Sequence, residues 1–424
     1  MNNELLWVFN LISNWLVSMV GLILTGLVLS WQTLWATNQA QYADQFAPSF
    51  HEKAIRTIYR VVVGLLSIYF YLSMPLVMLL VLTISLVGFY FLLSFGSFSI
   101  WAGVFLFGFT IYTFIAFVRG VFARTPQGPL GKPMSQEDAP TLWACVYEVA
   151  ERIGTRPLDA IHITPDPSIG VVERGGFIRK MRGGGERCLI LGLGALPGMT
   201  QAQFKAILAH EYGHFINRDT SGGTMVRRVR LAIGRMAESL HINGQDAWYN
   251  PAWLFITGFH RIFLYITLGA SRLQEVLADR FAASAYGGQH LIDGLTHVVA
   301  QSYAFDANVD HKADLSRRLN KDLPNLYLTV ELPDTIQSRL EPQIQAELAR
   351  DTNFRDSHPA FKTRVRYLQQ LIAVSEADED TQPVWDLFED AESLQCEMTM
   401  VIQRDIEAWC AQHEIWEAQQ RWGY

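Results

Sequence analysis

Two long apolar segments occupy the N-terminal part of the chain. Residues 5–43 contain no charged side chain, and residues 61–118 contain no Asp, Glu, Lys, Arg or His. A helix that crosses the hydrocarbon core of a bilayer needs about 20 predominantly apolar residues. The first segment therefore predicts one transmembrane helix, at about residues 11–35. The second predicts two more, at about 61–90 and 99–118, with a tight turn between them.

The alternative for the first segment is a cleaved signal peptide. Such a peptide begins with a positively charged region and has a short apolar core. The residues before this segment include Glu4 but neither Lys nor Arg, and the apolar run is longer than a signal peptide requires. We therefore expect the segment to remain in the protein as a membrane anchor.

Basic residues near the ends of the apolar segments predict the orientation, because cytoplasmic loops are enriched in Lys and Arg. The leader and the turn within the second segment have none. The basic residues of the first loop and of the region after the third helix are Lys53, Arg56, Arg60, Arg119, Arg124 and Lys132. We therefore expect the N-terminus outside and the large C-terminal part in the cytoplasm.

Beyond the third apolar helix, the pattern changes to that of a folded domain. A Pro- and Gly-rich linker at 125–131 precedes a helical stretch at 136–153 and short strands at 160–164, 169–172 and 188–193. The remainder is mainly helical. The expected fold class is α+β, with N-terminal transmembrane helices followed by a mainly helical domain that contains a small β-sheet.

The expected division of the chain is a membrane domain at 1–124, a catalytic domain at 133–372 and a C-terminal helical extension at 373–424. A glycine-rich basic segment at 174–185 lies between two of the strands. It lacks the GK[ST] sequence of a phosphate-binding loop. It is either a flexible hairpin tip or a basic tip that touches the anionic leaflet of the membrane.

Composition excludes several classes of protein. Of the 424 residues, 50% are hydrophobic and 18% are charged, against about 25% charged in a typical soluble domain. The net charge of −7 lacks the basic excess of a nucleic-acid binder, so we expect no nucleic-acid partner. The four cysteines form no CxxC pair, which argues against a zinc ribbon or a redox dithiol.

A helix expected at about 200–216 carries the residues that point to chemistry. Thr200 and Gln203 form a capping box at its start. His210 and His214 are four positions apart, so both imidazoles lie on one face of the helix. Two neutral imidazoles so placed can hold one Zn²⁺ ion, and Glu211 beside them can reach a water molecule. This is the HExxH pattern of zinc metalloproteases.

A catalytic zinc ion needs a third protein ligand and an open position. Thr220 stands where one class of HExxH enzymes has a third His, so that class is excluded. A later helix offers Glu275 and Asp279, which share a face. Glu275 can bind the metal while Asp279 orients one of the ligating imidazoles. The alternative is an exposed acidic pair on a helix.

The chain resembles the HtpX-like membrane zinc metallopeptidases, the family that also contains the CaaX prenyl protease. The matching blocks are residues 210–219, 271–283, 356–359 and 364–365, and the resemblance covers about residues 135–370. It implies a zincin-type metallopeptidase domain with one Zn²⁺ per chain. One departure from the family is the segment 168–172, which lacks the Asn-Ala-Phe common in the strand along the substrate.

The resemblance implies a role for each matching residue. His210, His214 and Glu275 would bind zinc, and Glu211 would be the general base. His358 would stabilise a transition-state oxyanion or gate the metal, and its alternative is a loop histidine satisfied by its surroundings. Arg364 would lie near the cleft, and its alternative is a simple ion pair with Asp279 or Glu275.

We therefore expect a membrane-anchored zinc metalloendopeptidase of the bacterial inner (plasma) membrane, with its catalytic domain in the cytoplasm. Its partners would be the lipid bilayer and polypeptide substrates, namely membrane or membrane-proximal proteins, for example in protein quality control. The alternatives are a CaaX-type processing protease, or a membrane-anchored chaperone or binding protein with a non-catalytic metal site.

A further apolar stretch lies at 253–268, just before Glu275. It contains His260 and Arg261 near its centre. An Arg at the centre of a bilayer costs about 2.5–3.5 kcal/mol on insertion scales. The stretch is therefore expected to be a buried or interfacial helix rather than a fourth transmembrane helix.

Overall fold

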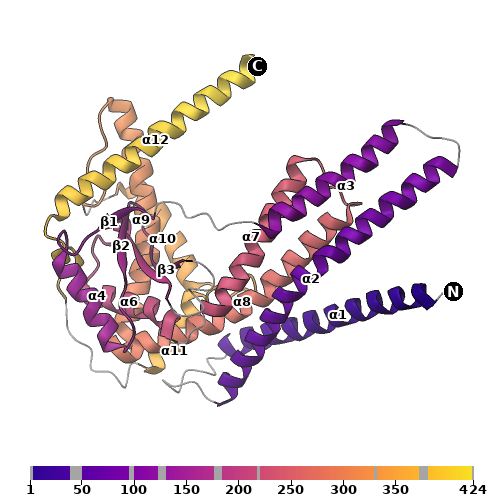
Figure 1. The fold of residues 1–424 in the computed structure, drawn as a ribbon. Helices are drawn as coiled ribbons and strands as arrows, with labels where there is room; N and C mark the ends of the chain where they lie inside the picture. Colours follow the sequence, from indigo (N-terminus) through magenta and orange to yellow (C-terminus); the bar gives the residue numbers. More distant parts are fainter. Residues whose placement is uncertain are drawn as a thin grey trace.

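The computed structural model describes residues 3–38, 50–94, 100–122, 130–175, 184–216, 220–328, 332–371 and 381–422. A group of long helices projects from a domain that contains the sheet (Figure 1). Most of the predicted turn at 94–97, most of the linker at 125–131 and the tip of the glycine-rich segment lie outside the described residues.

The apolar segments form the helices α1 (Asn3–Asn38), α2 (Phe50–Ser94) and α3 (Ile100–Val121). α2 and α3 lie antiparallel (Figure 1), and Thr110 Oγ1 donates to Ser85 Oγ across them at 2.8 Å. All three helices are long and apolar enough to cross a membrane. α1 and α2 extend beyond the predicted bounds at both ends, and α3 continues past the predicted residue 118 to Val121.

A second helical hairpin packs on the first three helices. It consists of α7 (Thr220–Ile242) and α8 (Pro251–Tyr286). The Phe70 ring of α2 lies 6.1 Å and 5.1 Å from the rings of Phe255 and Phe259 on α8. α8 is a fourth helix of suitable length and hydropathy. One face of its apolar half is buried against the neighbouring helices, and its position relative to the membrane stays a prediction.

The sheet contains β1 (Lys132–Met134), β2 (Ala160–Thr164), β3 (Ile169–Arg174) and β4 (Glu186–Gly192), in the order β1-β2-β4-β3. β2 and β4 are parallel, and the outer strands pair antiparallel with them. The three predicted strands are confirmed, whereas β1 is too short for a visible alternation of polar and apolar residues. β3 is an edge strand, so one side of its backbone is unpaired within the described sheet.

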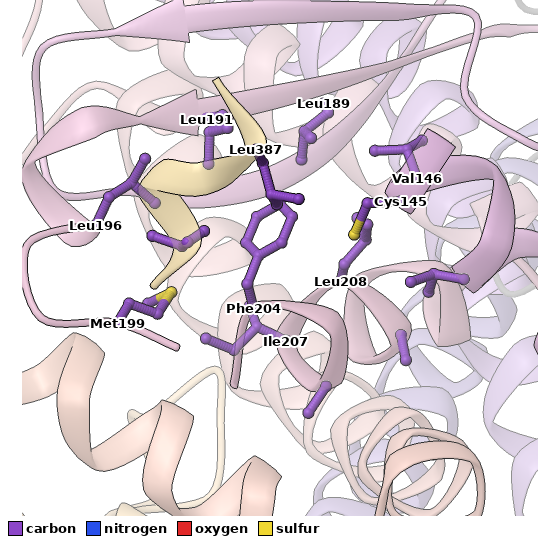
Figure 2. Close-up of a cluster of buried hydrophobic side chains, with 14 of the residues drawn as sticks. Cys145, Val146, Leu189, Leu191, Leu196, Met199, Phe204, Ile207, Leu208 and Leu387 are labelled. Carbon is purple, nitrogen blue, oxygen red and sulfur yellow. The ribbon is translucent and has the colours of Figure 1, made fainter. Parts of the chain in front are cut away.

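The core of this domain lies between the sheet and the helices α4 (Pro140–Arg152) and α6 (Gln201–Ile216). Figure 2 shows Phe204 and Leu208 of α6 pointing toward Leu189 and Leu191 of β4. The predicted capping box is confirmed: Thr200 N donates to Gln203 Oε1 at 3.0 Å, and Gln203 N donates to Thr200 Oγ1 at 3.3 Å. The cap and the apolar face together fix where α6 begins and which side it buries.

α6 packs directly on α8, and a glycine permits the close approach. A Cβ added to Gly213 would lie 2.9 Å from the Cα and 3.2 Å from the Cβ of Ala278. Such distances are below ordinary van der Waals contact, so the two helices could not lie this close with a larger residue. This contact brings the second half of α8 alongside the HExxH helix.

The remaining α-helices of the described residues follow α8 along the chain. They are α9 (Gly288–Leu319), α10 (Asp334–Ala349), α11 (Phe361–Leu371) and α12 (Ala391–Trp422), with the short 3₁₀ helices η1 (Leu193–Ala195) and η3 (Val384–Leu387). The predicted α+β class with long apolar helices is confirmed. The segment just before α12 is part of the main core, because Val384 and Leu387 are buried in it.

Candidate active site

His210 and His214 lie on the face of α6 that meets α8. Their ring centroids are 4.9 Å apart. His210 is buried, and the side chain of His214 is 25% exposed. One ligand atom from each of His210, Glu211 and His214 falls within 4.8 Å of the others. The helical spacing thus places three groups with metal-binding atoms around one point, as the sequence predicts.

α8 brings Glu275 to the same point. Its Oε2 lies 3.3 Å from His210 Nε2, and its Oε1 lies 3.5 Å from His214 Nε2. Ligand atoms about 2.0–2.1 Å from one zinc ion in tetrahedral geometry are about 3.3–3.4 Å apart. Glu275 Oε2 is buried without a hydrogen-bond donor among the described residues. The donor set and its spacing therefore fit a zinc ion held by two imidazoles and one carboxylate.

Asp279, one turn after Glu275, contacts the His210 ring on the side opposite Nε2. Its Oδ1 lies 2.8 Å from His210 Nδ1. Arg364 of α11 donates to both carboxylate oxygens, with Nε at 2.9 Å from Oδ2, and the Tyr367 hydroxyl donates to Oδ2 as well. Because Nδ1 of His210 is occupied by the carboxylate, its Nε2 is directed at Glu275 and the metal position.

Charges within this cluster set the protonation of the histidines. Burial opposes a charge on His210, but the Asp279 carboxylate outweighs burial and raises the His210 pKa to about 10. Burial and the neighbouring His210 charge lower the pKa of His214. The pKa of Arg364 is raised despite burial because of Asp279. In the metal-free protein at neutral pH, the imidazole of His214 is therefore neutral. The imidazole of His210 is protonated on both nitrogens and positively charged.

Glu211 faces the edge strand rather than the Glu275 carboxylate. Its Oε2 accepts a hydrogen bond from the backbone N–H of Val171 in β3 at 3.2 Å. Gly192 N donates to Ser168 O, so in this antiparallel ladder residues 168, 170 and 172 pair with β4 and residues 169 and 171 point to the open edge. The candidate general base is thus oriented by the strand along which a peptide could bind.

His358 lies in the loop before α11 and reaches the site. Its Nδ1 is 2.9 Å from Glu275 Oε1, and its side chain is 60% exposed. The predicted residues His210, Glu211, His214, Glu275, Asp279, His358 and Arg364 are therefore all brought together. Residues 217–219, which the resemblance includes, lie outside the described residues.

The structure adds contacts that the sequence analysis missed. Tyr367 binds Asp279, and its position three residues after Arg364 on one helix face could have indicated it. The Val171 N–H is a backbone group, so no residue type could have revealed its contact with Glu211. Arg272 is fully buried one turn before Glu275, although an arginine in a helix is usually read as exposed.

Comparisons with known proteins agree with this geometry. Residues 177–372 match the family model of peptidase family M48. A Protease HtpX homolog of Tropheryma whipplei is 25% identical over 305 residues, which cover 68% of this chain and 94% of that protein. Homologues of the same name from Aquifex aeolicus and Acaryochloris marina are 32% and 28% identical, each over 52% of its own length. No solved structure matches the chain.

Three observations therefore agree: the four apolar helices, the HExxH helix packed on a helix that brings the Glu275 carboxylate to both histidines, and the matches to curated proteases. The chain is an integral membrane protein that contains a protease domain. Residues 177–372 match peptidase family M48, and the chain is similar to the HtpX-like membrane metallopeptidases over about two thirds of its length.

Proposed function

We propose that the protein is a membrane-anchored zinc metalloendopeptidase, with His210, His214 and Glu275 as the zinc ligands. The observation that carries the proposal is the convergence of two Nε2 atoms on the two oxygens of Glu275, at 3.3 Å and 3.5 Å, directly beside Glu211. A structural zinc site would need a fourth protein ligand and no base. A base next to three ligands is what hydrolysis requires.

The chain's own residues would divide the work of peptide hydrolysis. A zinc ion held here would supply Lewis-acid activation of water and of the scissile carbonyl. Glu211 accepts the proton of the attacking water and passes it to the leaving nitrogen. The Val171 N–H holds Glu211 Oε2, which leaves Oε1 for the water. His358, exposed beside Glu275, is placed to donate to the oxyanion of the transition state.

The open edge of β3 supports an extended peptide as substrate. An added strand would pair with the backbone groups of Ile169 and with the carbonyl of Val171, which point away from β4, because the Val171 N–H is already donated to Glu211. Pairing through the backbone favours unfolded or extended segments over folded domains. The site also lies on α8, whose first half packs among the apolar helices. This position supports membrane or membrane-proximal proteins as substrates, as in quality control of membrane proteins.

The proposal is tested by comparing the purified wild-type protein with the Glu211→Gln variant. Both should bind one zinc ion per chain. Hydrolysis of casein or of an unfolded membrane protein should fall by about 10²–10⁴ in the variant, the usual contribution of a general base. Glu238→Gln on the exposed side of α7 is the matched control and should keep full activity. Equal turnover by wild type and Glu211→Gln would overturn the mechanism.

The two alternative functions give different outcomes. A CaaX-type enzyme would cleave a prenylated peptide and spare the same peptide without the prenyl group, whereas the proposed endopeptidase cleaves both. A binding protein or chaperone would retain unfolded chains without cleavage, in the wild type as in Glu211→Gln. Orientation is tested separately with a reporter fused after Tyr424, which should be active as a cytoplasmic marker. A reporter active only outside the cytoplasm would contradict the proposed topology.

A further inference from the structure

Arg272 connects three parts of the molecule that are far apart in sequence. It lies on α8, one turn before Glu275, and is fully buried. Its Nη1 donates to the backbone carbonyls of Asp356 at 2.9 Å and Phe354 at 3.3 Å. Its Nη2 reaches the Ser30 hydroxyl of α1 at 3.4 Å. One guanidinium group therefore joins a candidate membrane helix to the loop before α11.

That loop carries His358, two residues after Asp356. The loop is folded on itself, because the Asp356 carboxylate accepts a hydrogen bond from Asn353 N at 2.7 Å. The Phe354 ring packs against Tyr265 of α8, with centroids 5.2 Å apart. The position of His358 relative to the metal ligands thus depends on how the loop is held against α8.

α1 is in direct contact with α8 at the same level. Ser30 Oγ donates to the backbone carbonyl of Tyr265 at 2.9 Å. A Cβ added to Gly269 would collide with the hydroxyls of Tyr59 and Ser30. The hydroxyls of Ser30 on α1 and Tyr59 on α2 therefore both reach α8 at Gly269, just beside Arg272. A shift of α1 along α8 would change the contacts of the guanidinium group.

The guanidinium group of Arg272 is suited to connect backbone segments by hydrogen bonds. Burial of a cation is costly unless its donors are satisfied. Here the two terminal nitrogens donate to backbone carbonyls and a hydroxyl rather than to a carboxylate, and Nε has no acceptor among the described residues. The planar guanidinium can donate to both sides at once, which the single ammonium group of a lysine cannot reproduce.

We propose that Arg272 is a positioning residue that couples the seating of α1 to the loop of His358. When α1 is seated, the guanidinium holds the loop so that His358 stays beside Glu275. When α1 is displaced, the loop loosens and His358 leaves the site. The inference rests on the proposed function for its effect on catalysis, but the coupling of α1 to the loop is a structural property that can be measured without substrate.

The first test compares full-length wild type, Arg272→Met and Arg272→Lys in lipid nanodiscs. Arg261→Met, on the exposed side of the same helix, is the matched control. Hydrogen exchange of the amides at 353–358 should be about 10- to 100-fold faster in Arg272→Met, the effect of losing hydrogen bonds from a charged donor. The kcat of Arg272→Met should fall about tenfold at unchanged KM and zinc content. The kcat of Arg272→Lys should lie between those of Arg272→Met and the wild type. Unchanged exchange and kcat in Arg272→Met would overturn the proposal.

The second test alters α1 alone. Ser30→Val removes the hydroxyl that Arg272 contacts, while Thr25→Val on the exposed face of α1 is the control. Exchange at 353–358 should rise in Ser30→Val and not in Thr25→Val. An unchanged loop in Ser30→Val would refute the coupling to α1. A wild-type protein that hydrolyses no peptide would contradict the proposed function and leave the exchange test valid.

Discussion

Asp279 shows how one buried side chain organises the site. It has no exposed surface, and it is contacted by His210, Arg364 and Tyr367. A carboxylate in this position is stable only because cationic and hydroxyl donors surround it. In return it fixes the ring orientation of His210 and leaves Nε2 free for a metal ion.

We expect Asp279→Asn to weaken zinc binding by about 10- to 100-fold, the usual effect of removing a partner of a ligating histidine. The amide cannot accept from all three neighbours as the carboxylate does, and Arg364 is left without its countercharge. Chelator competition measures the zinc Kd. Asp293→Asn, on the exposed side of α9, serves as the control and should bind zinc like the wild type. An unchanged Kd in Asp279→Asn would show that Asp279 does not support the ligand.

Zinc binding should release a proton from His210 at neutral pH. Its raised pKa of about 10 means that the metal-free protein is stabilised by the charged form below the unfolded pKa, and loses this contribution as the pH rises through about 10. Zinc requires the neutral ring, so its affinity should rise about tenfold per pH unit between pH 7 and 9. Calorimetry at pH 7.5 in buffers of different ionisation enthalpy counts the proton. Zero protons released would contradict a charged His210.

At the scale of elements, the contact between α6 and α8 creates the site. α6 supplies two imidazoles and the proposed base, and α8 supplies Glu275 and Asp279. Neither helix has a complete ligand set alone. Their distance is set at Gly213, whose missing side chain allows Ala278 to approach.

Gly213→Ala should therefore lower the melting temperature and the zinc affinity together. The added methyl group would push α8 away by a few tenths of an ångström or more, and overpacking of this kind costs about 1–3 kcal/mol. Thermal unfolding with and without zinc gives both quantities. Gly234→Ala on α7, where a Cβ meets nothing within 4 Å, is the control and should be neutral or slightly stabilising. Equal behaviour of the two variants would refute the role of Gly213 in spacing the helices.

At the scale of the whole molecule, the hydrophobic core of the domain that contains the site includes residues outside the segment that matches the family. Residues 177–372 match family M48, yet Val384 and Leu387 are buried in the same core. Figure 2 shows Leu387 beside Phe204 of the HExxH helix. Gln201 N donates to Gln382 O, and Val384 N donates to Met199 O, so this segment also binds the start of α6 through its backbone.

Leu387→Ala should destabilise the catalytic domain by about 2–5 kcal/mol, as for other buried leucines that leave a cavity. Met400→Ala, on the exposed side of α12, should cost much less. Denaturant unfolding followed by the fluorescence of the full-length protein measures both. A cost for Leu387→Ala no larger than that for Met400→Ala would mean that the segment before α12 is an appended element, independent of the catalytic core.

The sequence by itself determined the features that depend on neighbours along the chain. Apolar runs predicted three long helices, the spacing of His210 and His214 predicted one ligand face, and Thr200 with Gln203 predicted the start of α6. These signals are local, since a helical repeat or a capping box is complete within one turn or one span. The fold class followed from the same patterns.

Only the tertiary structure decided which distant groups complete the site. The hydrogen bond from Val171 N–H to Glu211, the contact of Tyr367 with Asp279 and the reach of Arg272 to α1 each join segments that are separated by 40 or more residues. Such contacts depend on strand order and helix packing, and no residue pattern along the chain encodes them separately. The sequence therefore identified the helix that carries the proposed metal ligands, and the packing of α8, β3 and α11 around it determined which other groups complete the site.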